Sequence, residues 1–389
     1  AQLVSGTTAQ DLTVDNINTT SINSGQVSGR KNLVINGAMQ VAQRGTSSTS
    51  TGYQTVDRFE FNFANTDESP TQAQVDVASG TTPYNAGFRK ALKITNGNQT
   101  GGAGGGDRMR IMHKIEAQNM ANSGWNYTSS SSNVTLSFYI KSSVAQNFYF
   151  RVTTSDGTSQ NFIMETGSLS ADTWTKITKT IPGNSNLTFN NDNGIGLFLV
   201  FTQYRGTDNT SSPSLNTWVA TGSGNDLYPT FPTTWYTTND ATYEITGVQL
   251  EVGATATDFE HRSFAEELKL CQRYYQQISR SSSINSVDGT FAAGTCNTNA
   301  GNGGILQVMV RFQTTMRAAP TMTQSGTFSH HVSGVNVADC SLAFNQAYVD
   351  GIKCTGSQTT FVSASGSCGE LTSKYSDTST ATIKADAEL

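Results

Sequence analysis

One long segment of the chain combines aromatic side chains with an irregular pattern of polar residues and prolines. It spans residues 203–240 and includes Pro213, Pro229 and Pro232. Aromatic rings offer flat apolar faces that stack on sugar rings, and long ordered loops in compact domains are usually functional. The segment therefore holds the candidate ligand-binding residues. They are Tyr204, Trp218, Tyr228, Trp235 and Tyr236.

Other roles stay open for these aromatic residues. Rings in so long a loop can simply pack the loop onto its own domain, or they can lie in a contact between subunits. If the segment binds a sugar, Asp208, Asp226 and Asn239 are near enough in sequence to hydrogen-bond its hydroxyl groups. The sequence alone does not choose among packing, sugar binding and subunit contact.

The chain lacks the short motifs of common hydrolases. It has no GxSxG motif in a strand-to-helix setting and no HExxH motif. Glycoside hydrolysis requires two carboxylates about 5–9.5 Å apart. No such pair stands out among Glu165, Asp172, Asp208 and Asp240. We therefore expect no catalytic residue and a protein that is not an enzyme.

The histidines and cysteines do not follow a metal-ligating pattern. His330 and His331 are adjacent, so on a strand they point to opposite faces. The five cysteines include no CxxC spacing, which argues against a structural zinc site. We expect no metal and no cofactor. Free thiols are the default in a reducing compartment, and a disulfide between Cys354 and Cys368 is the alternative.

Composition indicates a β-rich protein with a neutral polar surface. Of 389 residues, 35% are hydrophobic and 14% are charged, and the net charge is −5 without a lysine and arginine cluster. This excludes a highly charged disordered chain and gives no electrostatic footprint for nucleic acid. No apolar run reaches the roughly 18 residues that span a bilayer, so we expect no membrane insertion. The first residue is not methionine, so it is either a processed end or the start of a fragment.

Residues 31–260 consist of short runs in which apolar and polar residues alternate. Phe59, Phe61 and Phe63 share one strand face, and the pattern recurs near residues 134–140 and 148–152. Such strands without intervening helices indicate a β-sandwich, and roughly ten of them fit a jelly roll. The run 195–201 is apolar on both faces, so we expect it in the interior of a sheet.

The densest pattern begins with a strand that changes phase. Tyr243 and Ile245 alternate in one phase, whereas Val248 and Leu250 alternate in the other. A slip of one residue would turn the second pair to the wrong face of the sheet. We therefore predict a β-bulge at residues 246–247, where Gly247 tolerates the required backbone.

A helix is predicted over residues 261–279. Ser263 and Glu266 have the spacing of a capping box, in which each residue satisfies a free backbone amide of the other. The apolar stripe of this helix can pack on its own domain or against copies of itself around a threefold axis. In the second case the interface residues are Phe264, Leu268, Cys271 and Tyr275.

The two ends of the chain are poor in bulky apolar residues. Residues 1–30 carry a sparse apolar set, which predicts a flexible tail or a β stalk of three wound copies. Residues 280–389 predict a smaller β domain, with strands near 305–313, 342–349, 359–364 and 379–385 and a thin core. Both features favour a homotrimer. The stalk residues that would face its axis are Leu12, Val14, Ile17 and Ile22.

Several segments together resemble a known class of proteins. They are KNLVINGAMQVAQRG at 31–45, VDRF at 56–59, VQLEVG at 248–253, FEHRS at 259–263, EELKLCQRYYQ at 266–276, MRAAPT at 316–321 and ADAEL at 385–389. These segments are similar to those of phage tail-fibre and other virion-surface proteins.

The resemblance implies a jelly-roll sandwich similar to carbohydrate-binding modules and a C-terminal tip that contacts the receptor. It further implies attachment to another virion protein at residues 1–30, and a virion location after synthesis in the cytoplasm of an infected bacterium. The expected function is attachment to the host cell surface through glycans or another envelope receptor. A structural appendage without a receptor and a polysaccharide-degrading tailspike are the alternatives.

Overall fold

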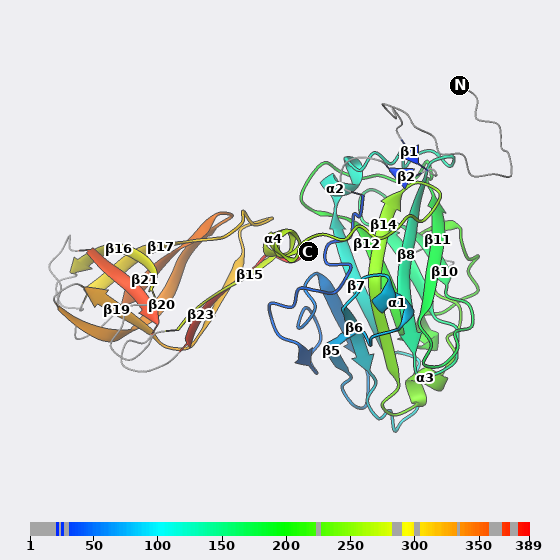
Figure 1. The fold of residues 1–389 in the computed structure, drawn as a ribbon, viewed down its shortest axis with the longest axis horizontal. Helices are drawn as coiled ribbons and strands as arrows, with labels where there is room; N and C mark the ends of the chain where they lie inside the picture. The colour runs from blue at the N-terminus through cyan, green and yellow to red at the C-terminus, as the bar shows by residue number, and fades with distance from the viewer. Residues whose placement is uncertain are drawn as a thin grey trace.

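The all-β architecture expected from the sequence is confirmed by the structure, a computed structural model (Figure 1). In the N-terminal segment, β1 (Ser21–Ile22) pairs with β2 (Gly25–Gln26). Leu12, Val14 and Ile17 and the side chain of Ile22 lie outside the described part of the chain, so the stalk interface stays a prediction. The described residues are 21–22, 25–26, 31–222, 227–281, 290–298, 304–332, 335–357, 368–373 and 380–389.

The N-terminal domain is a sandwich of two six-stranded antiparallel sheets, which we call the β7 sheet and the β14 sheet. The β7 sheet contains β13 (Trp218–Ala220), β10 (Gln160–Glu165), β9 (Tyr149–Thr154), β12 (Ile195–Arg205), β7 (Arg108–Glu116) and β4 (Phe59–Ala64), in that order. The β14 sheet contains β11 (Thr175–Pro182), β8 (Asn133–Ser142), β14 (Thr242–Val252), β6 (Lys90–Thr95), β5 (Thr71–Asp76) and β3 (Ser47–Ser48).

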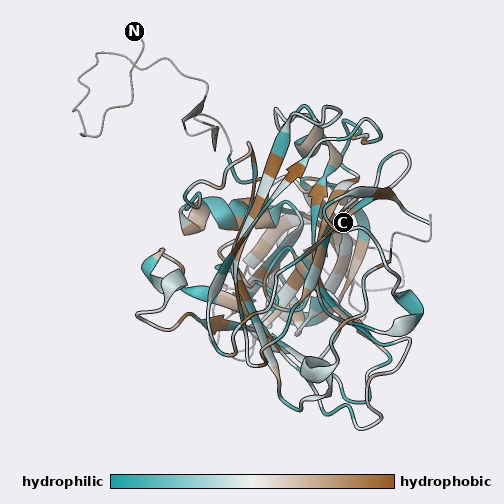
Figure 2. Cartoon of the chain, turned by 90° about the vertical axis from the view of Figure 1, so that its right-hand side faces the viewer, coloured by the Kyte–Doolittle hydropathy of each residue, from teal (hydrophilic) through white to brown (hydrophobic). Residues whose placement is uncertain are grey.

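The core of the sandwich is made by alternate side chains of the two sheets. Phe138 of β8 meets Phe150 of β9 and Phe201 of β12 at ring distances of 5.1 and 5.0 Å, in T-shaped contacts. Figure 2 shows hydrophobic and hydrophilic residues alternating along the sandwich strands. As predicted, β12 lies in the sheet interior, between β9 and β7. Burying both sheets against each other accounts for the alternation in the sequence.

The predicted β-bulge is confirmed. The pairing of β14 with β8 shifts register between Thr246 and Gln249, and Gly247 has a φ of +65°. This left-handed backbone favours glycine because an L side chain is strained there. The bulge returns Val248 and Leu250 to the buried face.

Short helices α1 (Thr82–Asn85), α2 (Ala117–Ala121) and α3 (Thr234–Thr237) join the strands, and the longest helix is α4 (Phe264–Gln272). The capping box of Ser263 and Glu266 is confirmed. The prediction that the helix continues to residue 279 is wrong, since β15 (Tyr275–Ser281) begins three residues after it ends. Tyr275 and Ile278 pair instead with β23 (Thr380–Asp386), a long-range contact that local spacing cannot reveal. No helix among the described residues is long and apolar enough to cross a membrane.

The α4 helix packs on its own chain. Cys271 is fully buried and clusters with Ile35 and Val41 of the sandwich domain, with Leu268 partly buried beside them. Tyr275 is also buried, whereas Phe264 is 56% exposed. Of the predicted interface residues on this helix and its end, Phe264 is thus the one whose side chain is mainly open to solvent.

The C-terminal domain combines a closed barrel with a small sheet. Cys354 lies in the barrel as a free thiol, so it does not form the disulfide with Cys368. His330 is buried and His331 is half-buried, as expected for opposite strand faces. The strand predicted at 359–364 lies outside the described residues. The barrel strands are β16 (Thr290–Thr298), β17 (Gly304–Arg311), β21 (Gly351–Ser357), β20 (Val335–Tyr348), β19 (Phe328–Val332) and β22 (Cys368–Ser373), and the small sheet is β15, β23 and β18 (Thr321–Ser325).

The last residue of β23, Asp386, and the residues 387–389 that follow it join the two domains, beside α4 (Figure 1). Arg58 of the sandwich is fully buried and forms an ion pair with Glu388, whose side chain is 6% exposed. The Arg58 guanidinium also lies 3.4 Å from the centre of the Tyr274 ring and donates to the Lys114 carbonyl oxygen at 2.6 Å. Although burial opposes its charge, Glu388 raises the pKa of Arg58 above its usual value.

A second arginine repeats this arrangement at the edge of the junction. Arg44 pairs with Asp386 at 2.9 Å and with Glu388 at 3.4 Å, and its guanidinium lies 3.6 Å from the centre of the Tyr275 ring. Two arginines of the sandwich thus hold the end of β23 and the segment after it, and each is covered by a tyrosine.

We predict that Glu388→Gln lowers the free energy of unfolding by about 3–5 kcal/mol, because it leaves the buried Arg58 charge without its partner. Urea unfolding measures the change. The control is Asp350→Asn, which breaks an exposed pair with Arg311 at 2.9 Å and is expected to change stability by less than about 1 kcal/mol. Equal small effects of the two substitutions would show that the buried pair does not hold the domains.

Candidate functional site

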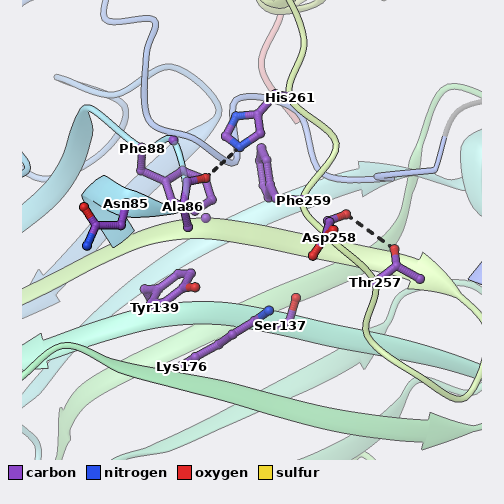
Figure 3. Close-up of a pocket in the computed structure, with 12 residues that line it drawn as sticks. Asn85, Ala86, Phe88, Ser137, Tyr139, Lys176, Thr257, Asp258, Phe259 and His261 are labelled. Atoms are coloured by element: carbon purple, nitrogen blue, oxygen red, sulfur yellow. Dashed lines mark hydrogen bonds between the residues drawn. The ribbon is translucent and has the colours of Figure 1, made fainter. Parts of the chain in front are cut away.

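A cavity of about 440 Å³ opens on the outer face of the β14 sheet (Figure 3). It lies beside the β14 bulge, over β8 and β11, and is closed on the other side by the end of α1 and by the corner at residues 257–261. Its volume lies in the range of pockets that hold small molecules. The side chains that define its chemistry are Phe88, Tyr139, Lys176, Asp258, Phe259 and His261.

Aromatic rings surround Phe88 in this pocket. The Phe88 side chain is 1% exposed, and Phe259 meets it edge to face at a ring distance of 4.8 Å. Tyr139 of β8 and His261 lie 5.7 and 5.2 Å from the same ring. Tyr139 and Phe259 are only partly buried. The pocket therefore presents apolar ring surface that is fixed by mutual packing.

Two glycines with left-handed backbones make room for these rings. A Cβ atom on Gly247 would lie 2.7 Å from Cζ of Phe88, and one on Gly87 would lie 2.9 Å from Cε1 of His261. The φ angles are +65° and +97°. The β14 bulge therefore restores the strand phase and also lets the Phe88 ring lie against the strand.

Polar groups lie at the mouth of the pocket. His261 is fixed by a hydrogen bond of 2.9 Å from Nε2 to the Ala86 carbonyl oxygen. The Lys176 ammonium lies 5.9 Å from the centre of the Tyr139 ring, and Asp258 is exposed. Lysine donates and a carboxylate accepts hydrogen bonds, so the two can bind hydroxyl groups of a ring that stacks on the aromatic surface.

The aromatic residues singled out in the sequence lie elsewhere, at the β7 sheet and the end of the sandwich. Tyr204 stacks on Tyr236 at a ring distance of 4.1 Å, and Trp235 donates from Nε1 to the Thr242 carbonyl oxygen at 2.9 Å. The exposed fractions are 3% for Tyr204, 5% for Tyr228, 0% for Trp235 and 1% for Tyr236, and Trp218 is half-buried. Burial supports the packing interpretation, since no face of Trp235 is open to a ligand in this structure.

Sequence reasoning missed the residues of the pocket. Phe88, Tyr139 and Phe259 come from segments far apart in the chain and have no common spacing. Two signals were present, namely the glycine directly before Phe88 and the glycine of the bulge. Neither reveals a cavity until the fold brings the two together.

The carboxylates considered in the sequence do not lie in the pocket. Glu165 is half-buried, and Asp172, Asp208 and Asp240 are exposed. No group of three His, Cys, Asp or Glu suited to a metal occurs in the described chain.

We predict that Gly247→Ala lowers the free energy of unfolding by about 2–4 kcal/mol, because the left-handed backbone is strained and the new methyl group meets Phe88. Gly124→Ala is the matched control, since its φ is +83° and a Cβ atom there would meet nothing within 4 Å. The control isolates backbone strain, which we expect to contribute about 1–2 kcal/mol. Equal losses in thermal or urea unfolding would contradict the close approach of Gly247 to Phe88.

No family model and no curated protein matches the chain. Among solved structures, the enzymatically active domain of bacteriophage CBA120 tailspike protein 4 is similar at 8% identity and a TM-score of 0.30, over 57% of this chain but only 21% of that one. A putative sugar-binding protein from Bacteroides thetaiotaomicron is similar at 12% identity and a TM-score of 0.30, over 57% of this chain and 99% of that one. The N-terminal cellulose-binding domain of Cellulomonas fimi β-1,4-glucanase C is similar at 10% identity and a TM-score of 0.26, over 56% and 99%. Similarity at this level carries no inference about ligand or activity.

Proposed function

We propose that this chain is a virion-surface attachment protein of the tail-fibre type and that it binds a glycan of the host envelope in the pocket beside the β14 bulge. The observation that carries the proposal is the aromatic pocket, with Tyr139 and Phe259 partly exposed around the buried Phe88. The resemblance of the chain to tail-fibre segments, from residue 31 to residue 389, supplies the virion context.

The pocket suits a sugar because it offers both kinds of contact that a sugar needs. The CH faces of a pyranose ring are apolar and stack on aromatic rings, whereas its hydroxyl groups require donors and acceptors at the rim. Phe259 and Tyr139 provide the first, and Lys176 and Asp258 provide the second. One such contact is weak, so attachment would depend on several sites that act together on one particle.

The trimer is part of the proposal. Phe264 begins α4 and is 56% exposed, whereas Cys271 on the same helix is buried, so a partner subunit could cover Phe264. Three copies would place three pockets on one fibre, and linked sites raise avidity without tighter individual contacts. Residues 1–30 then join the fibre to another virion protein, and the C-terminal domain forms its tip.

We predict that the purified chain binds one or more members of an array of bacterial surface glycans, and that Phe259→Ala weakens this binding at least about tenfold in calorimetric titration. The reason is the loss of one stacking face, equivalent to about 1.4 kcal/mol or more. Tyr127→Ala is the matched control, because Tyr127 is a half-buried aromatic residue of the same domain outside the pocket. The control should bind as the unaltered chain does.

A competition experiment with the purified chain and its Phe259→Ala variant distinguishes an attachment protein from a structural appendage. If the chain is an attachment protein, we expect a saturating dose of the purified chain to compete with phage particles for adsorption to cells. The Phe259→Ala variant should compete less well. Absence of glycan binding together with absence of competition would favour the structural appendage. Shortening of the bound polysaccharide during incubation would favour the tailspike.

For the trimer, we predict that light scattering gives three times the chain mass for the full chain, and that Phe264→Glu lowers the trimer fraction. The introduced charge would be buried without a partner in the proposed contact. Lys269→Glu on the exposed side of α4 reverses a charge without entering the apolar stripe and should leave the mass unchanged. A full chain that stays monomeric at all concentrations would rule out the trimer.

A further inference from the structure

The segment of residues 203–240 that carries the aromatic residues, here called the aromatic loop, forms a second cavity against the outer face of the β7 sheet. Thr202 of β12 donates from Oγ1 to the Tyr228 hydroxyl at 3.0 Å, and the Ser211 amide donates to the Tyr228 carbonyl oxygen at 2.7 Å. Farther along, the Asn216 amide donates to the Ile163 carbonyl oxygen at 2.8 Å. The loop is thus fixed to the sheet, and a cavity of about 110 Å³ lies between them.

Four arginines line this small cavity. Arg108 and Arg110 alternate on β7, Arg151 projects from β9, and Arg205 ends β12. Arg205 lies directly opposite Arg108 in the pairing of β12 with β7. Like charges in directly opposed strand positions destabilise a sheet, so the fold holds this cluster together against repulsion.

The charges of three of these arginines are not neutralised by the protein that the structure describes. Among the described acidic residues, none forms a salt bridge with Arg108, Arg110 or Arg205. The nearby carboxylate of Glu60 pairs with Lys114 at 2.9 Å. Nε of Arg108 and Nε of Arg110 are buried without a hydrogen-bond partner in the described chain.

The electrostatic consequence appears in the pKa values of the cluster. Burial, together with Arg110, Arg108 and Arg151, lowers the pKa of Arg205 to about 10. Burial and the positive charges of Arg108 and Arg151 also lower the pKa of Arg110. An anion between these groups would reverse the repulsion and would supply acceptors for the unused donors.

The size of the cavity limits what can enter. A volume of about 110 Å³ is below the range of pockets for whole small molecules and suits a single charged group. A groove of about 350 Å³ adjoins it, shares Arg110 and Arg151, and continues over Phe198 and Asn62. The rest of a molecule that carries the charged group can lie in this groove.

We propose that the arginine cavity binds an oxyanion, namely a phosphate, sulfate or carboxylate group, carried by an acidic glycan that extends into the groove over Phe198. Arginine is suited to this because its planar guanidinium donates two parallel hydrogen bonds to such groups. The oxyanion site is independent of the aromatic pocket, whereas its assignment to a glycan rests on the proposed function.

The test is thermal unfolding in sodium phosphate against sodium chloride of equal ionic strength. We expect phosphate to raise the unfolding temperature of the chain by about 2–4 °C and to have no such effect on Arg110→Gln/Arg205→Gln. In chloride, that variant should unfold at a higher temperature than the unaltered chain, because it relieves the repulsion. A lower unfolding temperature would show that the arginines are structural, which would overturn the proposal.

The matched control removes the same charge elsewhere. Arg89→Gln/Arg311→Gln alters two exposed arginines outside the cavity and should keep the full phosphate shift. If both double variants lose the rise in unfolding temperature equally, phosphate acts by general ion screening and the arginine cavity is not an oxyanion site. Phe259→Ala should also keep the phosphate shift, so failure of the aromatic pocket is distinguishable from failure of this one.

The glycan is tested with oligosaccharides that differ only in charge. We expect sulfated or uronic acid oligosaccharides to bind at least about tenfold more tightly than their neutral counterparts, and Arg110→Gln/Arg205→Gln to abolish this preference. If phosphate raises the unfolding temperature but charged oligosaccharides bind no more tightly than neutral ones, the assignment to an acidic glycan is wrong and the cavity is a site for a free anion.

Discussion

The buried ion pair between Arg58 and Glu388 determines how the two domains of this chain are joined. A buried charge is strongly destabilising unless it has both a counter-charge and hydrogen-bond acceptors. Arg58 obtains these from Glu388, the Lys114 carbonyl oxygen and the face of Tyr274. Each partner lies on a different part of the chain, so their simultaneous presence fixes β7, the segment after β23 and the link between α4 and β15 relative to one another.

The two candidate sites lie on opposite outer faces of the sandwich that this junction supports. On the β14 sheet, a bulge and a left-handed glycine leave room for the Phe88 ring and produce an aromatic pocket. On the β7 sheet, a long loop covers the strands and encloses arginines at directly opposed positions. Both sites are built on rigid strands, and each contains a local departure from the rules of sheet stability. Such departures are expected where function imposes the residue type.

The sequence predicted well those features that depend on neighbouring residues. The sandwich strands, the bulge at Gly247 and the capping box at Ser263 follow from alternation, phase and short spacing. The predicted helix extended too far toward the C-terminus because Tyr275 and Ile278 fit helical spacing. In the structure these two residues pair with a strand about a hundred residues later. That pairing is a property of the tertiary fold.

The sites were harder to predict for the same reason. The aromatic loop was recognised as unusual, yet burial shows that Trp235 and Tyr236 belong to the core. Tyr204 and Tyr228 instead line the arginine cavity, and its four arginines are ordinary strand residues when each is considered alone. Only the register of β7, β9 and β12 brings the four arginines together.

The separation of Arg58 and Glu388 along the chain has a consequence for biosynthesis. The two residues are 330 positions apart, so a ribosome that adds 5–20 residues per second produces the partner of Arg58 roughly 15–65 s later. During that interval the strands of the sandwich can assemble, but the Arg58 charge lacks its counter-charge. A chain that stops short of residue 388 therefore lacks the counter-charge of Arg58 and keeps only the other contacts of the junction, such as the pair of Arg44 with Asp386.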